Sequence, residues 1–198
     1  AAASNDPMLD SQPHYGVANL FGAWNHTTGS PDVVVQVLDT GIDTAHPDLQ
    51  QNIWLNPGEI CGNGIDDDGN GYVDDCNGYN HADDTGNDLL GGHWHGSHCG
   101  GTIAADTNNG IGVAGVAGGN GSPDSGARLM ISLGFGDSNT GGFAEALVYG
   151  ADNGAQISSN SWGYTSPDVY EQAVLDAIDY YNDLGGIVVF AAGNSNSE

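Results

Sequence analysis

Short apolar runs alternate with amphipathic stretches along most of the chain, and this alternation predicts strands and helices in turn. Four runs rich in apolar and β-branched residues predict buried strands at Val33–Leu38, Leu129–Leu133, Ala155–Asn160 and Ile187–Ala192. Helices are predicted over Val17–Trp24, from about His95, over Gly142–Asp152, and from Ser166-Pro167 to about Leu184. This order of elements predicts an α/β fold built on a doubly wound, mostly parallel sheet.

Residues 50–90 lack such periodicity and are rich in Gly, Asn and Asp, which predicts one long loop. Loops of this length inside a compact domain are usually functional or metal-bound. We therefore expect a metal-binding insertion over about 56–90, within a single domain that includes all of residues 1–198.

The charge of the chain adds a constraint, because 26 acidic residues stand against a single basic one, Arg128, for a net charge of −25. Self-repulsion of this kind weakens a compact state. The composition excludes nucleic-acid binding and attraction to anionic membranes, and no apolar run approaches the ~20 residues that span a bilayer. Bound Ca²⁺, which prefers carboxylate and carbonyl oxygens, is the expected compensating charge.

One segment of the predicted loop has the spacing of a calcium-binding loop. The run DDDGNGYVD at 66–74 follows the Asp-x-Asp-x-Asn-Gly pattern, in which alternate residues face one ion. The expected ligands are the side chains of Asp66, Asp68, Asn70 and Asp74 and the carbonyl of Tyr72. The glutamate that usually closes such a loop is missing, and Asp75 could replace it. A merely solvated acidic loop is the alternative.

Two of the three cysteines, Cys61 and Cys76, bracket this acidic segment, and we expect them to form a disulfide. Disulfides persist in oxidising compartments, so this bond predicts an extracellular protein. Closing a loop of this size contributes roughly 3 kcal/mol to the free energy of unfolding. Two free thiols are the alternative.

Polar residues of catalytic type occur where the predicted elements end or begin. Asp39 follows the first strand, Asn194 follows the last strand, and His95 stands at the start of a helix. Such ends can converge on one edge of a doubly wound sheet. An aspartate that orients a histidine makes it a good general base, and an asparagine amide can donate to an oxyanion. A zinc site is the rival interpretation, with the ligands His93, His95, His98 and Cys99.

Four segments resemble motifs of the subtilisin-like serine peptidases, in the order of that family. VVVQVLDTGIDTAHPDL resembles the aspartate motif and HGSHCGGTIAA the histidine motif. SNSWG resembles a segment that lines the first specificity pocket, and AAGNS resembles the segment of the oxyanion hole. The opening NDP and the aspartate-rich loop resemble calcium-binding, thermitase-type members, while the cysteine after HGSH resembles proteinase K-type members.

The resemblance implies a role for each matching residue. Asp39 would orient His95 as the base, and Asn194 would stabilise the oxyanion. The substrate pocket would be lined by Ser161-Trp162-Gly163 and Ala191-Ala192-Gly193, with Asn139-Thr140-Gly141 near the edge strand that pairs with extended substrate. A second calcium site would use Asp6, Asp48, Asn109 and the carbonyls of Ile111 and Val113, so that one or two Ca²⁺ ions are expected.

The chain departs from the family at its nucleophile, since it contains no Gly-Thr-Ser motif. The resemblance therefore implies a secreted, calcium-stabilised serine endopeptidase that acts on proteins or peptides. Residues 1–198 would form its N-terminal two-thirds, inactive without a companion C-terminal segment that carries the serine. The alternative is a non-catalytic extracellular module of the same fold that binds calcium or peptides.

Overall fold

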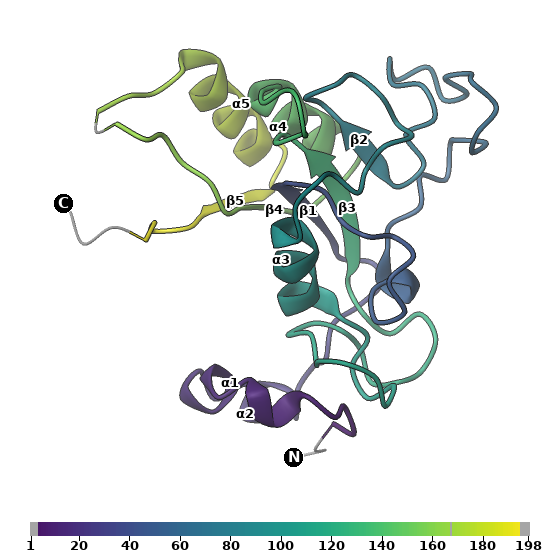
Figure 1. Cartoon of the computed structure of the whole chain (residues 1–198), viewed down its shortest axis with the longest axis vertical. Coiled ribbons are helices and arrows are strands. Elements are labelled where there is room, and N and C mark those ends of the chain that lie inside the picture. The colour runs from purple at the N-terminus through teal and green to yellow at the C-terminus, as the bar shows by residue number, and fades with distance from the viewer. Residues whose placement is uncertain (1–3, 167, 195–198) are drawn as a thin grey trace.

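The computed structural model describes residues 4–166 and 168–194, and its centre is a parallel sheet (Figure 1). In spatial order its five strands are β2 (Gly78–Asn80), β3 (Arg128–Leu133), β1 (Val34–Asp39), β4 (Ile157–Asn160) and β5 (Ile187–Phe190). The first strand, β1, pairs with β3 on one side and with β4 on the other. The first strand in the chain therefore lies in the middle of the sheet, where both of its faces are covered.

Helices cover both faces of this sheet, which confirms the doubly wound α/β prediction (Figure 1). One face packs against α3 (His95–Ala104), and the other against α4 (Phe143–Asp152), which lies beside α5 (Gln172–Asp183). Alternate side chains of a strand point to opposite faces. Accordingly, Val37 joins the core under α3, whereas Leu38 joins the core under α4 and α5. None of the described helices is long and apolar enough to cross a membrane.

Several predicted boundaries differ from the structure. The segment Val17–Trp24 belongs to two short helices, α1 (His14–Val17) and α2 (Leu20–Ala23), because Asn19 between them adopts a left-handed φ of 55°. The helix predicted from Ser166-Pro167 begins later, at Gln172, and Pro167 itself lies outside the described residues. The predicted loop at 50–90 contains β2 and one turn of 3-10 helix, η2 (Gln50–Asn52). Another such turn, η1 (Leu9–Ser11), lies near the N-terminus. Elements of three residues are too short to show a periodicity.

Candidate functional site

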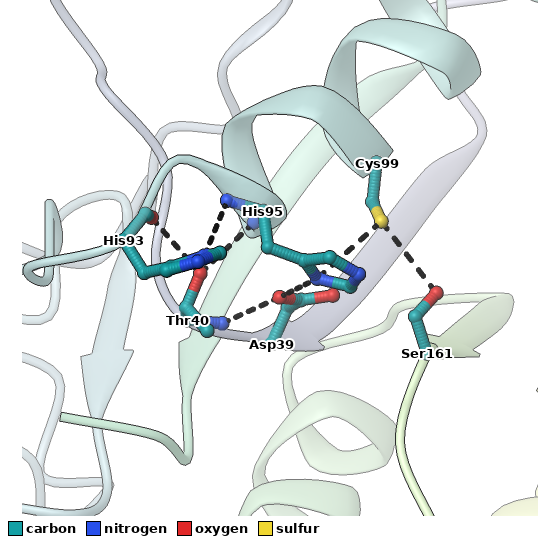
Figure 2. A network of polar contacts seen from close by, with 7 residues as sticks. Asp39, Thr40, His93, His95, Cys99 and Ser161 are labelled. Atoms are coloured by element: carbon teal, nitrogen blue, oxygen red, sulfur yellow. Dashed lines mark hydrogen bonds and ion pairs between the residues drawn. The ribbon is translucent and has the colours of Figure 1, made fainter. Parts of the chain in front are cut away.

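The carboxyl edge of the sheet brings an aspartate and a histidine together. Asp39 is the last residue of β1, and His95 is the first residue of α3, which packs on β1. The Oδ1 atom of Asp39 lies 2.7 Å from Nδ1 of His95, so the two side chains meet in a direct hydrogen bond (Figure 2). Helix α3 can approach this closely because a Cβ atom on Gly96 would lie 2.2 Å from the carbonyl oxygen of Gly41.

Thr40 fixes the geometry of this pair. Its backbone N–H donates to Asp39 Oδ1 at 2.7 Å. Its hydroxyl accepts from the N–H of Gly96 at 2.9 Å and donates to the carbonyl of His93 at 3.0 Å (Figure 2). One residue therefore ties the end of β1, which bears Asp39, to the start of α3, which bears His95.

Asp39 is buried whereas His95 is partly exposed, so the imidazole can reach a reactant while its carboxylate partner is shielded from water. The side chain of Asp39 is 4% exposed and that of His95 is 38% exposed. With Nδ1 held by the carboxylate, Nε2 is the ring nitrogen left to exchange a proton with a reactant, and the carboxylate stabilises the imidazolium that results. The second oxygen of Asp39, Oδ2, is buried without a partner among the described residues.

Cys99 lies one turn along α3, beneath the histidine. Its Sγ atom is 3.8 Å from His95 Nδ1 and 3.6 Å from the hydroxyl of Ser161 (Figure 2). Burial raises the pKa of the Cys99 thiol above its ordinary value, so the thiol stays protonated at neutral pH. Cys99 is half-buried and packs against the core under α3.

The four residues of the rival zinc site do not converge. Asp39, His95 and Cys99 offer atoms within 4.8 Å of one another, but His93 and His98 do not join them among the described residues. Instead both flank the exposed Trp94, with ring centroids 5.0 and 5.9 Å from its ring. His98 is exposed, because α3 turns that face to the solvent.

Aromatic side chains surround the predicted pocket segment Ser161-Trp162-Gly163, which follows β4. Trp162 stacks on Phe143 at 4.4 Å between ring centroids and meets Phe190 edge to face at 5.2 Å. Its indole N–H donates to Asn160 Oδ1 at 3.1 Å. Sequence reasoning did not place Phe143 or Phe190 here, although Phe143 begins α4 and Phe190 ends β5.

The remaining predicted substrate residues lie on either side of this segment. Thr140 pairs with Phe135 in an antiparallel bridge, and the N–H of Gly141 donates to the carbonyl of Gly134 at 3.0 Å. Asn139 contacts Asp83. Beyond β5, the segment Ala191-Ala192-Gly193 and Asn194 are exposed, and β4 separates their strand from the end of β1. The structure thus places all of these segments at the carboxyl edge of the sheet.

The predicted ligands of the acidic loop accept hydrogen bonds from the loop's own backbone. Asp66 accepts the backbone N–H groups of Gly69 and Gly71, at 2.7 and 2.9 Å. Asp74 turns away to accept the N–H groups of Asn63 and Gly64, each at 3.0 Å. The side chains of Asp68 and Asn70 contact each other, while the Tyr72 N–H donates to Asn70 Oδ1. The disulfide between Cys61 and Cys76 closes the loop, with Cα atoms 5.6 Å apart.

Two carboxylates that the sequence singled out, Asp68 and Asp75, converge with a third in this loop. Glu59, Asp68 and Asp75 offer oxygens within 4.8 Å of one another. Glu59 Oε2 is buried without a partner among the described residues, while the fully buried Asp75 accepts from Asn56, Asn70 and the hydroxyl of Tyr149. These all-oxygen donors suit Ca²⁺. Sequence reasoning missed Glu59 because it lies before Cys61, outside the motif at 66–74.

The N-terminal acidic residues join the loop that follows α3. Buried Asp6 accepts from the N–H groups of Asn109 and Gly110, and Met8 N–H donates to Gly112. Buried Asp48 accepts from the Asn109 amide and from the Val113 N–H, each at 2.9 Å. Ile111 donates its N–H to Asn109 Oδ1 at 2.8 Å. Hydrogen bonds thus connect Asp6 and Asp48 to the segment 109–113.

Burial and mutual repulsion raise the pKa of carboxyls in this cluster. Burial is the main cause for Asp48, with the charge of Asp6 adding to it. Burial likewise raises the pKa of Asp106, with Asp48 and Asp6 adding to the shift, and Asp106 Oδ1 has no partner among the described residues. Asp106 was not singled out from the sequence. A bound cation would relieve this repulsion.

Known proteins share both the sequence pattern and the fold. A family model described as "Subtilase family" matches residues 30–198. The thermophilic serine proteinase of Bacillus sp. (strain AK1) is 33% identical over 186 residues, which are 92% of this chain and 39% of that protein. The halolysin-like extracellular serine protease Nep of Natrialba magadii is 32% identical over 80% of this chain and 26% of its own length.

Among solved structures, the nisin leader peptidase NisP from Lactococcus lactis matches with a TM-score of 0.57 at 22% identity. The match covers 88% of this chain and 47% of that one, and it supports the fold. The chain therefore spans less than two thirds of the length of these relatives.

Proposed function

The chain belongs to the subtilase family of serine proteases, and we propose that residues 1–198 are the N-terminal two-thirds of a secreted, calcium-stabilised serine endopeptidase. The observation that carries this proposal is the 2.7 Å contact between Asp39 and His95 at the carboxyl edge of the sheet. A buried carboxylate on Nδ1 is the arrangement that makes an imidazole a directed general base.

In the proposed reaction, a serine on a companion C-terminal segment attacks the carbonyl carbon of the scissile peptide bond. His95 Nε2 takes the hydroxyl proton as the oxygen–carbon bond forms, while Asp39 stabilises the imidazolium. The Asn194 amide donates to the oxyanion. The intermediate then expels the amine, which takes the proton from His95. Water repeats the sequence on the acyl-enzyme and restores the serine.

The substrate would bind along the carboxyl edge as an extended strand. Asn139-Thr140-Gly141 already forms a short antiparallel bridge with Phe135, and its exposed side is available for pairing with a peptide. Ser161-Trp162-Gly163 and Ala191-Ala192-Gly193 would line the pocket for the side chain before the scissile bond. The aromatic neighbours of Trp162 support an apolar pocket wall.

The companion segment would cover β5. Parallel sheets are normally buried on both faces, yet Ile187 is 58% exposed, Val189 50% and Phe190 39% on this edge strand. Apolar side chains on an unpaired parallel strand are expected where further strands or helices pack. This surface supports a folded unit larger than the described residues.

We propose two calcium sites. The first uses Glu59, Asp68 and Asp75 in the acidic loop, in place of the ring of residues 66–74. The second uses Asp6, Asp48 and Asn109, with the carbonyls of Ile111 and Val113. Bound Ca²⁺ would supply charge neutralisation and would hold the N-terminus and the loop in place. The buried, unpaired oxygen of Glu59 supports the first site, and the mutual repulsion of Asp48 and Asp6 supports the second.

Secretion is supported by the Cys61–Cys76 disulfide, because disulfides persist in oxidising compartments. It is also supported by the likeness to the halolysin-like extracellular protease.

Fluorophosphonate labelling of the intact protein, with its C-terminal continuation, tests the catalytic role. We expect covalent modification of one serine outside residues 1–198, together with cleavage of unfolded casein. Replacement of His95 by Ala should abolish the labelling, because the serine loses its base. Normal calcium binding without labelling or cleavage would instead favour the non-catalytic calcium- or peptide-binding module.

A further inference from the structure

A cavity of about 490 Å³ lies outside the candidate active site, between the acidic loop, the segment after β2 and the start of α4. Its walls combine aromatic and acidic side chains. The residues that matter here are Tyr72, Tyr79, His81, Asp84 and Glu145, and we call this cavity the tyrosine pocket.

The aromatic rings that line the tyrosine pocket pack against one another. The rings of Tyr72 and Tyr79 meet edge to face, with centroids 4.8 Å apart, and His81 lies 5.8 and 5.4 Å from them. Tyr149 packs behind, 4.8 Å from Tyr72. Aromatic faces attract organic cations, and a rigid set of rings needs little reorganisation on binding.

The acidic groups of the pocket have no basic partner in the chain. Asp84 accepts the hydroxyl of Tyr79 at 2.9 Å, and both Asp84 and Glu145 are exposed. The only Lys or Arg in the sequence is Arg128. It begins β3 at the opposite edge of the sheet, where it pairs with Asp124. A Lys or Arg that pairs with these carboxylates would therefore come from outside the chain.

We propose that the tyrosine pocket binds a basic side chain, the guanidinium or ammonium group of an arginine or lysine on another polypeptide segment. Aromatic walls favour such a group over a metal ion. Among the described residues, Asp84 and Glu145 do not join a third ligand within 4.8 Å, whereas Glu59, Asp68 and Asp75 do. His81 Nε2, buried without a partner in the described structure, is a further polar atom available in the wall. Protease activity is not required for this binding.

Calorimetric titration of the intact protein in saturating Ca²⁺ tests the proposal. Nα-acetyl-arginine amide should bind at least about fivefold more tightly than Nα-acetyl-citrulline amide, its neutral isostere, because only the former has a cation for the rings and carboxylates. The peptide acetyl-Gly-Gly-Arg-Gly-Gly-amide should bind at least as tightly as the arginine amide. Binding of the small amide without the peptide would overturn a polypeptide source in favour of a free small cation.

Substitutions locate the binding. Glu145→Gln and Asp84→Asn should each weaken arginine binding about two- to fivefold, by removing one charge. Tyr72→Leu should weaken it, while Tyr72→Phe, which keeps the ring, should not. Asp179→Asn, an exposed carboxylate on α5, is the matched control and should leave binding unchanged. Equal affinity for arginine and citrulline amides overturns the proposal, as does loss of one bound Ca²⁺ in Glu145→Gln.

Discussion

The proposed catalytic role of Asp39 depends on its hydrogen bond to His95. Replacing one carboxylate oxygen of Asp39 by an amide nitrogen tests this role. Asp39→Asn keeps the shape but puts an amide against His95 Nδ1, which favours the wrong tautomer. In the intact protein we expect kcat for a peptide substrate to fall about 10⁴-fold, as in other serine proteases, with KM little changed. Asp32→Asn, an exposed carboxylate before β1, should retain full activity. More than a tenth of the normal kcat in Asp39→Asn would contradict the role.

His81 makes the stability of the protein depend on pH. Burial lowers the pKa of His81 to about 4, from 6.5. Between pH 4 and pH 6.5, His81 binds a proton in the unfolded chain but not in the folded protein. The contribution of buried, neutral His81 to the free energy of unfolding is therefore present above pH 6.5 and is lost as the pH falls towards 4. The loss amounts to about 3 kcal/mol.

Replacing His81 by Phe should remove this dependence, because the ring remains and nothing titrates. Urea unfolding of both proteins at pH 7 and pH 4.5, in saturating Ca²⁺, measures the difference. The fall in the free energy of unfolding should be smaller in His81→Phe by about 2–3 kcal/mol. Equal falls would show that His81 titrates equally in the folded and unfolded states.

The residues that sequence could predict are those tied to a local pattern. Asp39 and His95 stand at the end of an apolar run and at the start of a small-residue helix, so a doubly wound sheet already predicts that they meet. Glu59 carries no such signal. It reaches Asp68 and Asp75 only because the loop folds back on itself, and a contact of that kind depends on tertiary structure.

Among the elements, α3 depends on close approach to the loop after β1. A methyl group on Gly96 would lie 2.2 Å from the Gly41 carbonyl, whereas one on Gly101 would have only Leu49 nearby, at 3.9 Å. Gly96→Ala should therefore destabilise the protein by about 1–3 kcal/mol. Gly101→Ala should stabilise it by about 0.5–1 kcal/mol, since alanine is the better helix former.

Chemical unfolding of the two glycine variants gives the comparison directly, because both place the same methyl group in the same helix. Gly96→Ala should also reduce kcat, since displacing the start of α3 moves His95 away from Asp39. Equal stability changes in the two variants would mean that helix propensity, and not the contact with Gly41, decides the effect.

The acidic loop offers a test of which carboxylates hold the metal. Glu59→Gln should weaken the affinity of one Ca²⁺ site at least about tenfold, because it removes a ligand charge. Asp88→Asn, an exposed carboxylate elsewhere in the same insertion, serves as the control. Calcium titration by calorimetry measures both. An unchanged affinity in Glu59→Gln would return the site to the ring of residues 66–74.

Long helices and strands could be predicted from the sequence, whereas very short ones could not. The apolar runs that form β1, β3, β4 and β5 are long enough to identify in the sequence, and α4 ends at the predicted residue, Asp152. β2 has three residues and depends on pairing with β3. The predicted start of α5 was wrong because Ser166-Pro167 has the sequence of an N-cap, whereas the described helix begins at Gln172.

For the molecule as a whole, the net charge of −25 makes stability depend on counter-ions. Carboxylates in the two proposed calcium sites repel one another when Ca²⁺ is removed, and the remaining charge repels across the surface. Salt screens the surface repulsion, because the Debye length falls from about 30 Å at 0.01 M to about 3 Å at 1 M. Buried carboxylates such as Asp48 and Asp75 are screened much less.

Thermal unfolding of the intact protein separates these two contributions. Chelation of Ca²⁺ at low salt should lower the unfolding temperature, and 1 M NaCl should restore only part of the loss, because screening does not replace ions held between buried carboxylates. With Ca²⁺ bound, the same NaCl should raise the unfolding temperature by less than it does without Ca²⁺. Full recovery in NaCl alone would mean that surface repulsion, and not specific calcium binding, governs stability.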